Sequence, residues 1–272
     1  MKKTNQISYW AGGLLLIIAI GLCILPFLYM LLMSVKSTTN AYDIKFFIED
    51  LTLQHYQKIF SNPVFLRYLL NSVIVSICGV ALTLVVSCLA GYAFAKMNFI
   101  GNDKFFLLLV LTMLVPSEAI LVPLYIVVRG LGWVNTFKAL ILPLPTAFGV
   151  FIMRQAILGL PNELLESARM DGASDLRILW SVVLPLVHSS MITLAIFTFV
   201  GSWNNFAWPL IITTKDYMRT LPLALTTMEA QYDVDVGLKM ASATITFLPP
   251  FLVYLFLQSR FKIGMALSGL KG

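Results

Sequence analysis

Long uncharged hydrophobic runs recur along the whole chain and are separated by shorter polar stretches. A helix needs about 20 residues to cross the hydrocarbon core of a bilayer. We expect six runs to form transmembrane helices: Trp10–Met33, Asn71–Phe94, Phe105–Val128, Ala139–Ile157, Leu186–Trp208 and Met240–Phe256. Pro143 and Pro145 predict a kink in the fourth. The pattern therefore predicts an all-α, polytopic membrane protein.

The first run follows Lys2 and Lys3, as the hydrophobic part of a signal peptide does. It is longer than 20 residues and lacks a small-residue cleavage site, so we interpret it as an uncleaved anchor. An even number of spans puts both termini on one side. Basic residues divide almost equally between the two sides, but the short ends 1–9 and 259–272 favour the cytoplasm for both termini.

Composition agrees with a lipid environment. Hydrophobic residues make up 59% of the chain and charged residues 12%, whereas soluble domains have about 45–50% and about 25%. The net charge of +6 suits loops that face anionic lipid and gives no indication of nucleic-acid binding. The three cysteines, Cys23, Cys78 and Cys88, lie in apolar runs without metal-binding spacing, and we expect them to be small buried side chains.

Two long external segments, Ser34–Leu70 and residues 209–239, are rich in polar and aromatic residues and offer surface to a partner. We divide the chain into an N-terminal helix with its external loop (1–66), a transmembrane core (67–259) and a cytoplasmic tail (260–272).

Leu160–Pro185 is the least apolar internal stretch, and its first half has the marks of a short helix. Pro161 suits the first turn, where its missing N–H costs nothing. Glu163 and Glu166 lie near the positive end of this helix and Arg169 near the negative end. A helix of about nine residues is unstable alone in water, so we expect it to dock against another surface.

The Asp171-Gly172 pair predicts a turn in which Gly172 takes the left-handed conformation that ends a helix. A second short helix is expected from Ser174 towards Val183, before Pro185 opens the next span. The residues that we expect the first helix to expose on one side are Leu164, Leu165 and Ala168.

This loop resembles the Glu-Ala-Ala loop of binding-protein-dependent ABC importer permeases. The matching residues are Glu166-Ser167-Ala168, Gly172 four positions after Ala168, and Val182-Val183-Leu184-Pro185, with Ser167 and Val182 in place of the usual Ala and Ile. Further matches cover nearly the whole chain: Asn71-Ser72, Tyr92–Lys96, Val115-Pro116, Val122–Tyr125, Gly201–Leu210 and Leu270–Gly272. The longer pattern is most similar to the maltose-type branch, which carries sugars and glycerol phosphates.

The resemblance implies a type I ABC importer permease fold in a bacterial inner membrane. It implies a heterodimer with a second permease, two ATP-binding subunits and an external solute-binding protein. It also implies that the loop docks on an ATP-binding subunit through Glu163, Leu164, Leu165, Glu166, Ala168, Arg169, Asp171 and Gly172, and that the tail contacts these subunits through Lys271 and Gly272. The chain has no GxxxxGK phosphate loop, so we expect no cofactor on it and ATP and Mg²⁺ on the partners.

Polar groups at membrane depth are candidates for a translocation path. They are Glu118, Trp203, Asn204 and Asn205. For Glu118 the alternative is a helix break near Pro116, and for the other three it is an interfacial belt or packing between helices. His55 and His188 have no metal or triad partner in the sequence pattern, and we interpret both as structural.

Three other functions remain open. The same architecture serves importers of glycerol phosphate, amino acids, peptides or an anion. A secondary carrier would be expected to show internal repeats and several buried charges, whereas Glu118 alone lies well inside a predicted span. A membrane-bound enzyme would need grouped catalytic side chains at a membrane face, and the sequence offers none that we recognise.

Overall fold

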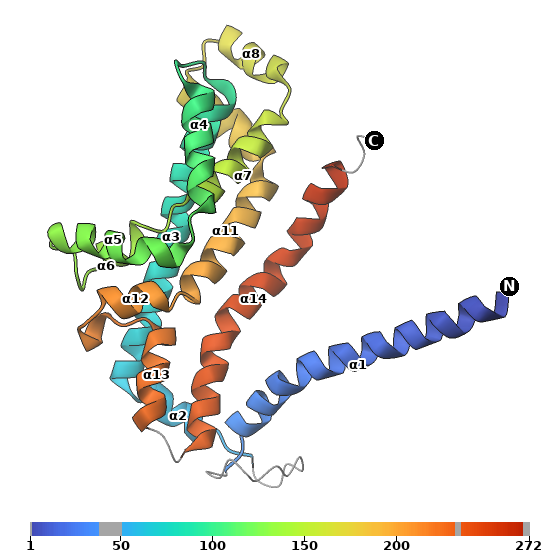
Figure 1. The fold of residues 1–272 in the computed structure, drawn as a ribbon, viewed down its shortest axis with the longest axis vertical. Helices are drawn as coiled ribbons and strands as arrows, with labels where there is room; N and C mark the ends of the chain where they lie inside the picture. Colours follow the sequence, from blue (N-terminus) through green and yellow to red (C-terminus); the bar gives the residue numbers. More distant parts are fainter. Residues whose placement is uncertain (1, 38–50, 232–234, 269–272) are drawn as a thin grey trace. The chain divides into compact units, whose positions relative to one another are not determined.

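The computed structural model describes the backbone of residues 2–37, 51–231 and 235–268 (Figure 1). The helices are α1 (Lys2–Ser34), α2 (Gln54–Phe60), α3 (Pro63–Lys96), α4 (Asn102–Leu111), α5 (Ser117–Gly130), α6 (Phe137–Ile141), α7 (Ala147–Leu158), α8 (Asn162–Met170), α9 (Asp175–Ile178), α10 (Leu184–Leu186), α11 (His188–Trp203), α12 (Ala207–Ile212), α13 (Leu221–Gln231) and α14 (Val236–Ser268). Short 3₁₀ turns are η1 (Thr112–Leu114) and η3 (Asp216–Met218), and η2 (Leu179–Val183) is π-helical. The all-α prediction is confirmed.

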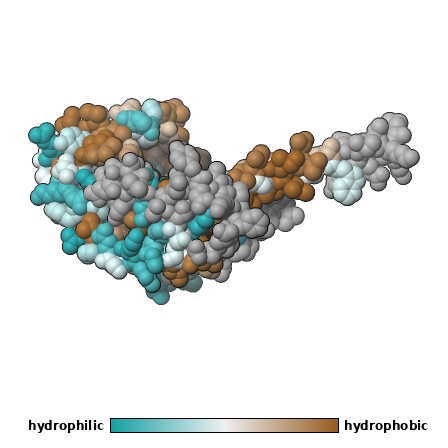
Figure 2. All heavy atoms as spheres, turned by 90° about the horizontal axis from the view of Figure 1, so that it is seen from below, coloured by the Kyte–Doolittle hydropathy of each residue, from teal (hydrophilic) through white to brown (hydrophobic). Residues whose placement is uncertain are grey.

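The chain forms two compact units. The first comprises Met1–Leu66 and Leu225–Leu248, and the second Arg67–Ala224 and Pro249–Gly272. In the first unit, exposed hydrophobic side chains cover α1 from Trp10 onward (Figure 2), as expected of a helix whose solvent is lipid. Phe27 of α1 packs on Phe247 of α14, with ring centroids 4.9 Å apart.

Polar contacts in the first unit gather around the end of α1. The Ser34 and Tyr56 hydroxyls lie 2.7 Å apart. His55 of α2 is buried, with Nε2 2.9 Å from the Lys36 carbonyl oxygen and Nδ1 3.6 Å from the Asp235 carboxylate. These contacts agree with a structural role for His55.

The second unit is built on α3, an unbroken helix of 34 residues. It crosses α7 at Gly91, where an added Cβ would lie 2.8 Å from the Met153 Cβ and 2.9 Å from the Arg154 nitrogen. Only a residue without a side chain allows this approach of the two backbones. The buried residues around the crossing are Cys88, Tyr92, Met153, Ile157, Leu165, Ile178, Leu179, Val183, Leu184, Val187 and Leu194.

Three predicted spans are wrong as continuous helices. The third is broken between η1 and α5, with a bend of 107° at Val115-Pro116. The fourth is divided into α6 and α7 around Pro143 and Pro145, a full interruption where we predicted a kink. The fifth begins after an 82° bend at Val187 and ends at Trp203, before α12. Proline has no N–H to donate and disfavours a helical residue before it, so helices end there.

Three helices in the described part of the chain are long and apolar enough to cross a membrane: Trp10–Ser34, Pro63–Lys96 and Val236–Gln258. Counting each bent pair as one span gives five. The short apolar helix α7 accounts for the fourth predicted run. Cys88 is buried as expected, but Cys23 and Cys78 are exposed, because lipid-facing positions of a membrane helix accept any apolar side chain.

Candidate functional site: the α8–α9 loop

The loop between α7 and α11 begins with α8, and the sequence determines both ends of this helix. Pro161 is extended, with ψ 136°, directly before the first helical residue, so it precedes the first turn in which we predicted it. Glu163 lies in the first turn and Arg169 in the last, where each opposes the partial charge of the helix end. The predicted nine-residue helix is confirmed.

Gly172 ends α8 through a Schellman motif. Its φ of +78° is left-handed. The Gly172 N–H donates to the Arg169 carbonyl at 2.9 Å, and the Ala173 N–H donates to the Ala168 carbonyl at 3.0 Å. The predicted turn and its conformation are confirmed. An added Cβ at Gly172 would meet no atom within 4 Å, so any substitution there acts through the backbone conformation.

Leu165 attaches α8 to the rest of the second unit. Its side chain is 3% exposed and belongs to the core around the α3–α7 crossing. Burial of a leucine contributes about 1.5–3 kcal/mol, which offsets the low intrinsic stability of so short a helix. The prediction that Leu165 is exposed beside Leu164 is therefore wrong, and Ala168 also packs partly against this core. One leucine, Leu165, thus anchors α8 in the core of its own chain.

The remaining apolar side chains of α8 point outward. Leu164 is 44% exposed and Met170 is 88% exposed. Glu163 and Glu166 are exposed as well. Leu164 and Met170 lie about 120° apart around the helix axis. In this single chain α8 thus exposes two separate apolar side chains among carboxylates.

A hydrogen-bonded triad closes the exit from α8. Asp175, the first residue of α9, accepts from the Tyr92 hydroxyl and from the Arg169 guanidinium, both on Oδ1 at 3.1 Å. The hydrogen bond to Asp175 raises the pKa of Arg169 above its ordinary value, so the guanidinium stays charged at every physiological pH. The triad joins α3, α8 and α9.

Lys96, the last residue of α3, closes the entry to α8. Its Nζ donates to the Leu160 carbonyl at 2.8 Å and to the Asn162 Oδ1 at 2.7 Å. Nearby, Arg154 of α7 donates from Nε to the Phe94 carbonyl at 3.2 Å and lies 3.9 Å above the Phe106 ring. The carbonyls at the end of α3 and at the end of α7 therefore receive cationic donors.

Tyr92, Lys96 and Asp175 were not among the predicted site residues. Tyr92 and Lys96 were recognised only as part of a matching motif. A signal was present, because a tyrosine and a lysine four residues apart at the end of a hydrophobic span share one helix face. The partner of Tyr92 on α9, Asp175, lies 83 residues away in the chain, and no local pattern indicates that pairing.

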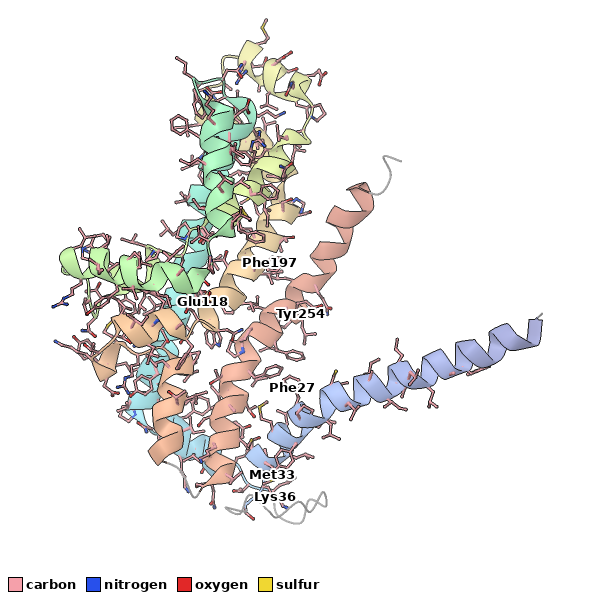
Figure 3. All side chains as sticks on the ribbon, viewed as in Figure 1. Phe27, Met33, Lys36, Glu118, Phe197 and Tyr254 are labelled. Atoms are coloured by element: carbon pink, nitrogen blue, oxygen red, sulfur yellow. The ribbon has the colours of Figure 1, made fainter. Side chains whose placement is uncertain are left out.

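The candidates for a translocation path have different environments. Glu118 is exposed in the first turn of α5, directly after the helix break, and accepts from the Ser117 hydroxyl at 2.9 Å (Figure 3). Trp203 is 1% exposed and stacks on Phe199, so it lines no open space in this structure. Asn204 is exposed, and the partly buried Asn205 accepts from the Trp208 N–H at 3.3 Å.

Two other expectations concern the tail contact and metal binding. The tail residues Lys271 and Gly272 lie outside the described residues. Among residues 2–37, 51–231 and 235–268, no group of three or more His, Cys, Asp or Glu side chains is placed to hold a metal ion.

Comparison with known proteins agrees with this architecture. Residues 84–265 match the family described as the binding-protein-dependent transport system inner membrane component. Over its full length the chain is 34% identical to the arabinooligosaccharides transport system permease protein AraQ of Halalkalibacterium halodurans, covering 99% of it. It is 29% identical to the lactose transport system permease protein LacG of Rhizobium radiobacter, over 91% of each chain. The chain belongs to this family of inner-membrane permease components, and it is a multi-pass membrane protein.

The fold also matches a solved permease. One chain of a bacterial ABC transporter involved in the import of the acidic polysaccharide alginate superposes with a TM-score of 0.85 and 22% identity, covering 95% of this chain and 98% of that one. The predicted type I ABC importer permease fold is confirmed.

Proposed function

We propose that this chain is one of two different permease subunits of an ATP-driven importer for an oligosaccharide. The observation that carries the proposal is the end-to-end likeness to AraQ, since 34% identity extends over the whole of this chain and almost the whole of its relative. LacG supports a saccharide cargo independently. In this proposal both termini are cytoplasmic, an external binding protein delivers the saccharide, and ATP and Mg²⁺ are bound by two partner subunits.

We further propose that α8 docks on an ATP-binding subunit. Its exposed residues include the apolar Leu164 and Met170 and the carboxylates Glu163 and Glu166, which suits a partner surface with both apolar and basic groups. Arg169, Asp171, Gly172 and Ala168 contribute by holding the shape of the loop, and Leu165 does so from the core. Residues 67–259 form the membrane core in this scheme, and the tail, including Lys271 and Gly272, provides a second contact.

Glu118 and Asn204 are the two path candidates that we retain. Both are exposed beside interruptions of predicted spans, where polar groups are tolerated because they line water or protein. Trp203 and Asn205 support this region by packing.

The test uses the complete importer reconstituted in liposomes, with uptake of labelled arabinotriose, lactose, an alginate trisaccharide and sn-glycerol 3-phosphate compared in parallel. We expect ATP-dependent uptake of one of the saccharides. Uptake of glycerol phosphate alone would contradict the saccharide assignment; the relative UgpE of Yersinia pestis, a permease protein of an sn-glycerol-3-phosphate transport system, is 34% identical over 72% of this chain. Uptake without ATP would contradict the importer class.

Docking is tested separately by co-purification. Leu164→Asp and Met170→Asp should release the ATP-binding subunits, because each puts a charge into the proposed apolar contact. Leu176→Asp is the matched control, since Leu176 is an exposed leucine of α9. Retention of the ATP-binding subunits by both α8 variants would contradict the docking proposal.

A further inference from the structure

We propose that the last turn of α3 is the lever arm of the α8–α9 loop, with Lys96 and Tyr92 as the two positioning residues that make α8 and α3 move as one body. The proposal rests on the docking function proposed for α8. After docking, the displacement of α8 must be transmitted to the membrane helices. The proposal assigns this step to Tyr92 and Lys96 of α3.

The two residues hold opposite ends of α8. Lys96 donates to Leu160 and Asn162, the residues on either side of Pro161 at the helix entry. Tyr92 donates to Asp175, which also holds Arg169 in the last turn of α8. Because residues four apart face the same side of a helix, one turn of α3 supplies both attachments.

A buried contact completes the joint between these attachments. Leu165 of α8 and the Tyr92 ring belong to the same core, and both are almost fully buried. A helix fixed at one point pivots about that point, whereas one held at both ends and at its middle follows its support. Displacement of α8 by a docked partner therefore displaces the end of α3.

The length of α3 carries that displacement into the membrane. It is a single helix without internal proline from Val64 to Lys96. The helices that follow the loop are interrupted near it, because η2 is π-helical and an 82° bend separates α10 from α11. The helix before the loop, α7, is only 12 residues long. Of these connections, α3 is the one that transmits a push over its whole length without a joint.

The experiment measures whether α8 and α3 move together. Spin labels are attached to the native Cys78 and to Ser167→Cys, an exposed position of α8 outside the proposed contact, in the complete importer in nanodiscs. Cys23 and Cys88 are replaced by alanine, and the partner subunits are free of cysteine. Cys78 lies about 21 Å along α3 from Tyr92, at 1.5 Å per residue, so the label distance falls in the range of pulsed electron–electron resonance. Distances are recorded without nucleotide and after trapping with ATP and vanadate.

We expect the parent complex to give the same narrow distance distribution in both states. The Tyr92→Phe/Lys96→Met variant should match it without nucleotide and shift by several ångströms, with broadening, after trapping. Lys96→Arg, which keeps cationic donors, should restore part of the parent distribution. Tyr254→Phe and Lys104→Met are the controls, because both side chains are exposed.

Three results would overturn the proposal, and the first two concern the distances. One is a nucleotide-dependent distance change in the parent complex, and the other is an unchanged distribution in the double variant. Loss of the ATP-binding subunits from a well-folded double variant would also overturn it, because the two residues would then build the docking site. If the double variant does not assemble, Tyr92→Phe alone, which removes one oxygen atom, is measured in its place. Failure of the parent chain to retain the ATP-binding subunits would instead contradict the proposed docking function.

Discussion

The two ends of α3 are attached to distant parts of the second unit in contrasting ways. At its start, the Tyr68 hydroxyl donates to Asp216 at 2.7 Å, and Asn71 donates from Nδ2 to the carbonyls of Tyr217 and Arg219 at 2.9 Å each. At its end, Lys96 and Tyr92 hold the entry and the exit of α8.

The partners explain the difference between the two ends. Asn71 is 4% exposed and bonds backbone carbonyls, and the equally buried Ser72 accepts from the Leu221 N–H at 2.8 Å. Asp175 and Arg169 have side chains that are almost half exposed, so water replaces a lost bond there at little cost. Buried bonds to backbone make the start of α3 a fixed attachment. At the end of α3 the partners Asp175 and Arg169 are solvated, so the loss of a single bond there costs less.

Removing the amide at the start of α3 should have the largest effect on stability. Asn71→Ala leaves the carbonyls of Tyr217 and Arg219 without their donor, and each unsatisfied buried group costs about 1–3 kcal/mol. We expect the free energy of unfolding to fall by about 2–4 kcal/mol and the apparent melting temperature by about 5–15 °C. The melting temperature is measured by size-exclusion chromatography of heated, detergent-solubilised protein.

Asn98→Ala is the control, because Asn98 is exposed just beyond the end of α3. If the two variants melt within a degree or two of each other, the amide bonds at the start of α3 contribute little to stability and the contrast between its two ends is removed.

Substitution of Gly172 should have an intermediate and local effect. Gly172→Val forces a β-branched residue into a left-handed conformation at a cost of about 1–3 kcal/mol, and no new contact compensates it. Transport should be lost while the binding protein still binds its saccharide. Gly172→Asn should retain most transport, because asparagine tolerates this conformation.

The measurement is ATP-dependent uptake in liposomes, with retention of the ATP-binding subunits checked on the same samples. Equal uptake by the valine and asparagine variants would show that the conformation of Gly172 does not matter for transport.

The smallest stability change is expected for Tyr92→Phe. The ring remains in the core. The Asp175 carboxylate keeps its hydrogen bond from Arg169 and accepts one from water in place of Tyr92, so the free energy of unfolding should fall by less than about 1 kcal/mol. Apparent melting temperature should fall by no more than about 4 °C, well short of the effect of Asn71→Ala. A fall as large as that of Asn71→Ala would mean that the end of α3 is as fixed as its start.

Local chemistry accounts for what the sequence predicted well. The nine-residue α8 and the left-handed Gly172 follow from a proline, charged ends and a glycine, all within about 12 residues of one another. Hydropathy located every apolar run but not the breaks inside three of them, because hydropathy measures transfer to lipid and does not register a missing N–H donor.

Leu165 and Trp203 show the limit of the prediction. Each was assigned to a functional surface, and each is buried within the chain. The burial of an apolar or aromatic side chain depends on which distant helix covers it. That information is absent from a helix of nine residues and from a motif of three.

The burial of Leu165 has a consequence for the evolution and engineering of such permeases. Residues 162–170 should not function when transferred to a relative on their own. The transferred helix would carry Leu165, whose side chain belongs in this chain to a core that includes Tyr92 and Met153. A chimera that exchanges α8 alone should therefore express poorly or dock out of register. The smallest unit that should transfer intact is α8 with the start of α9, together with the end of α3. These are two stretches that are far apart in the gene and must change together.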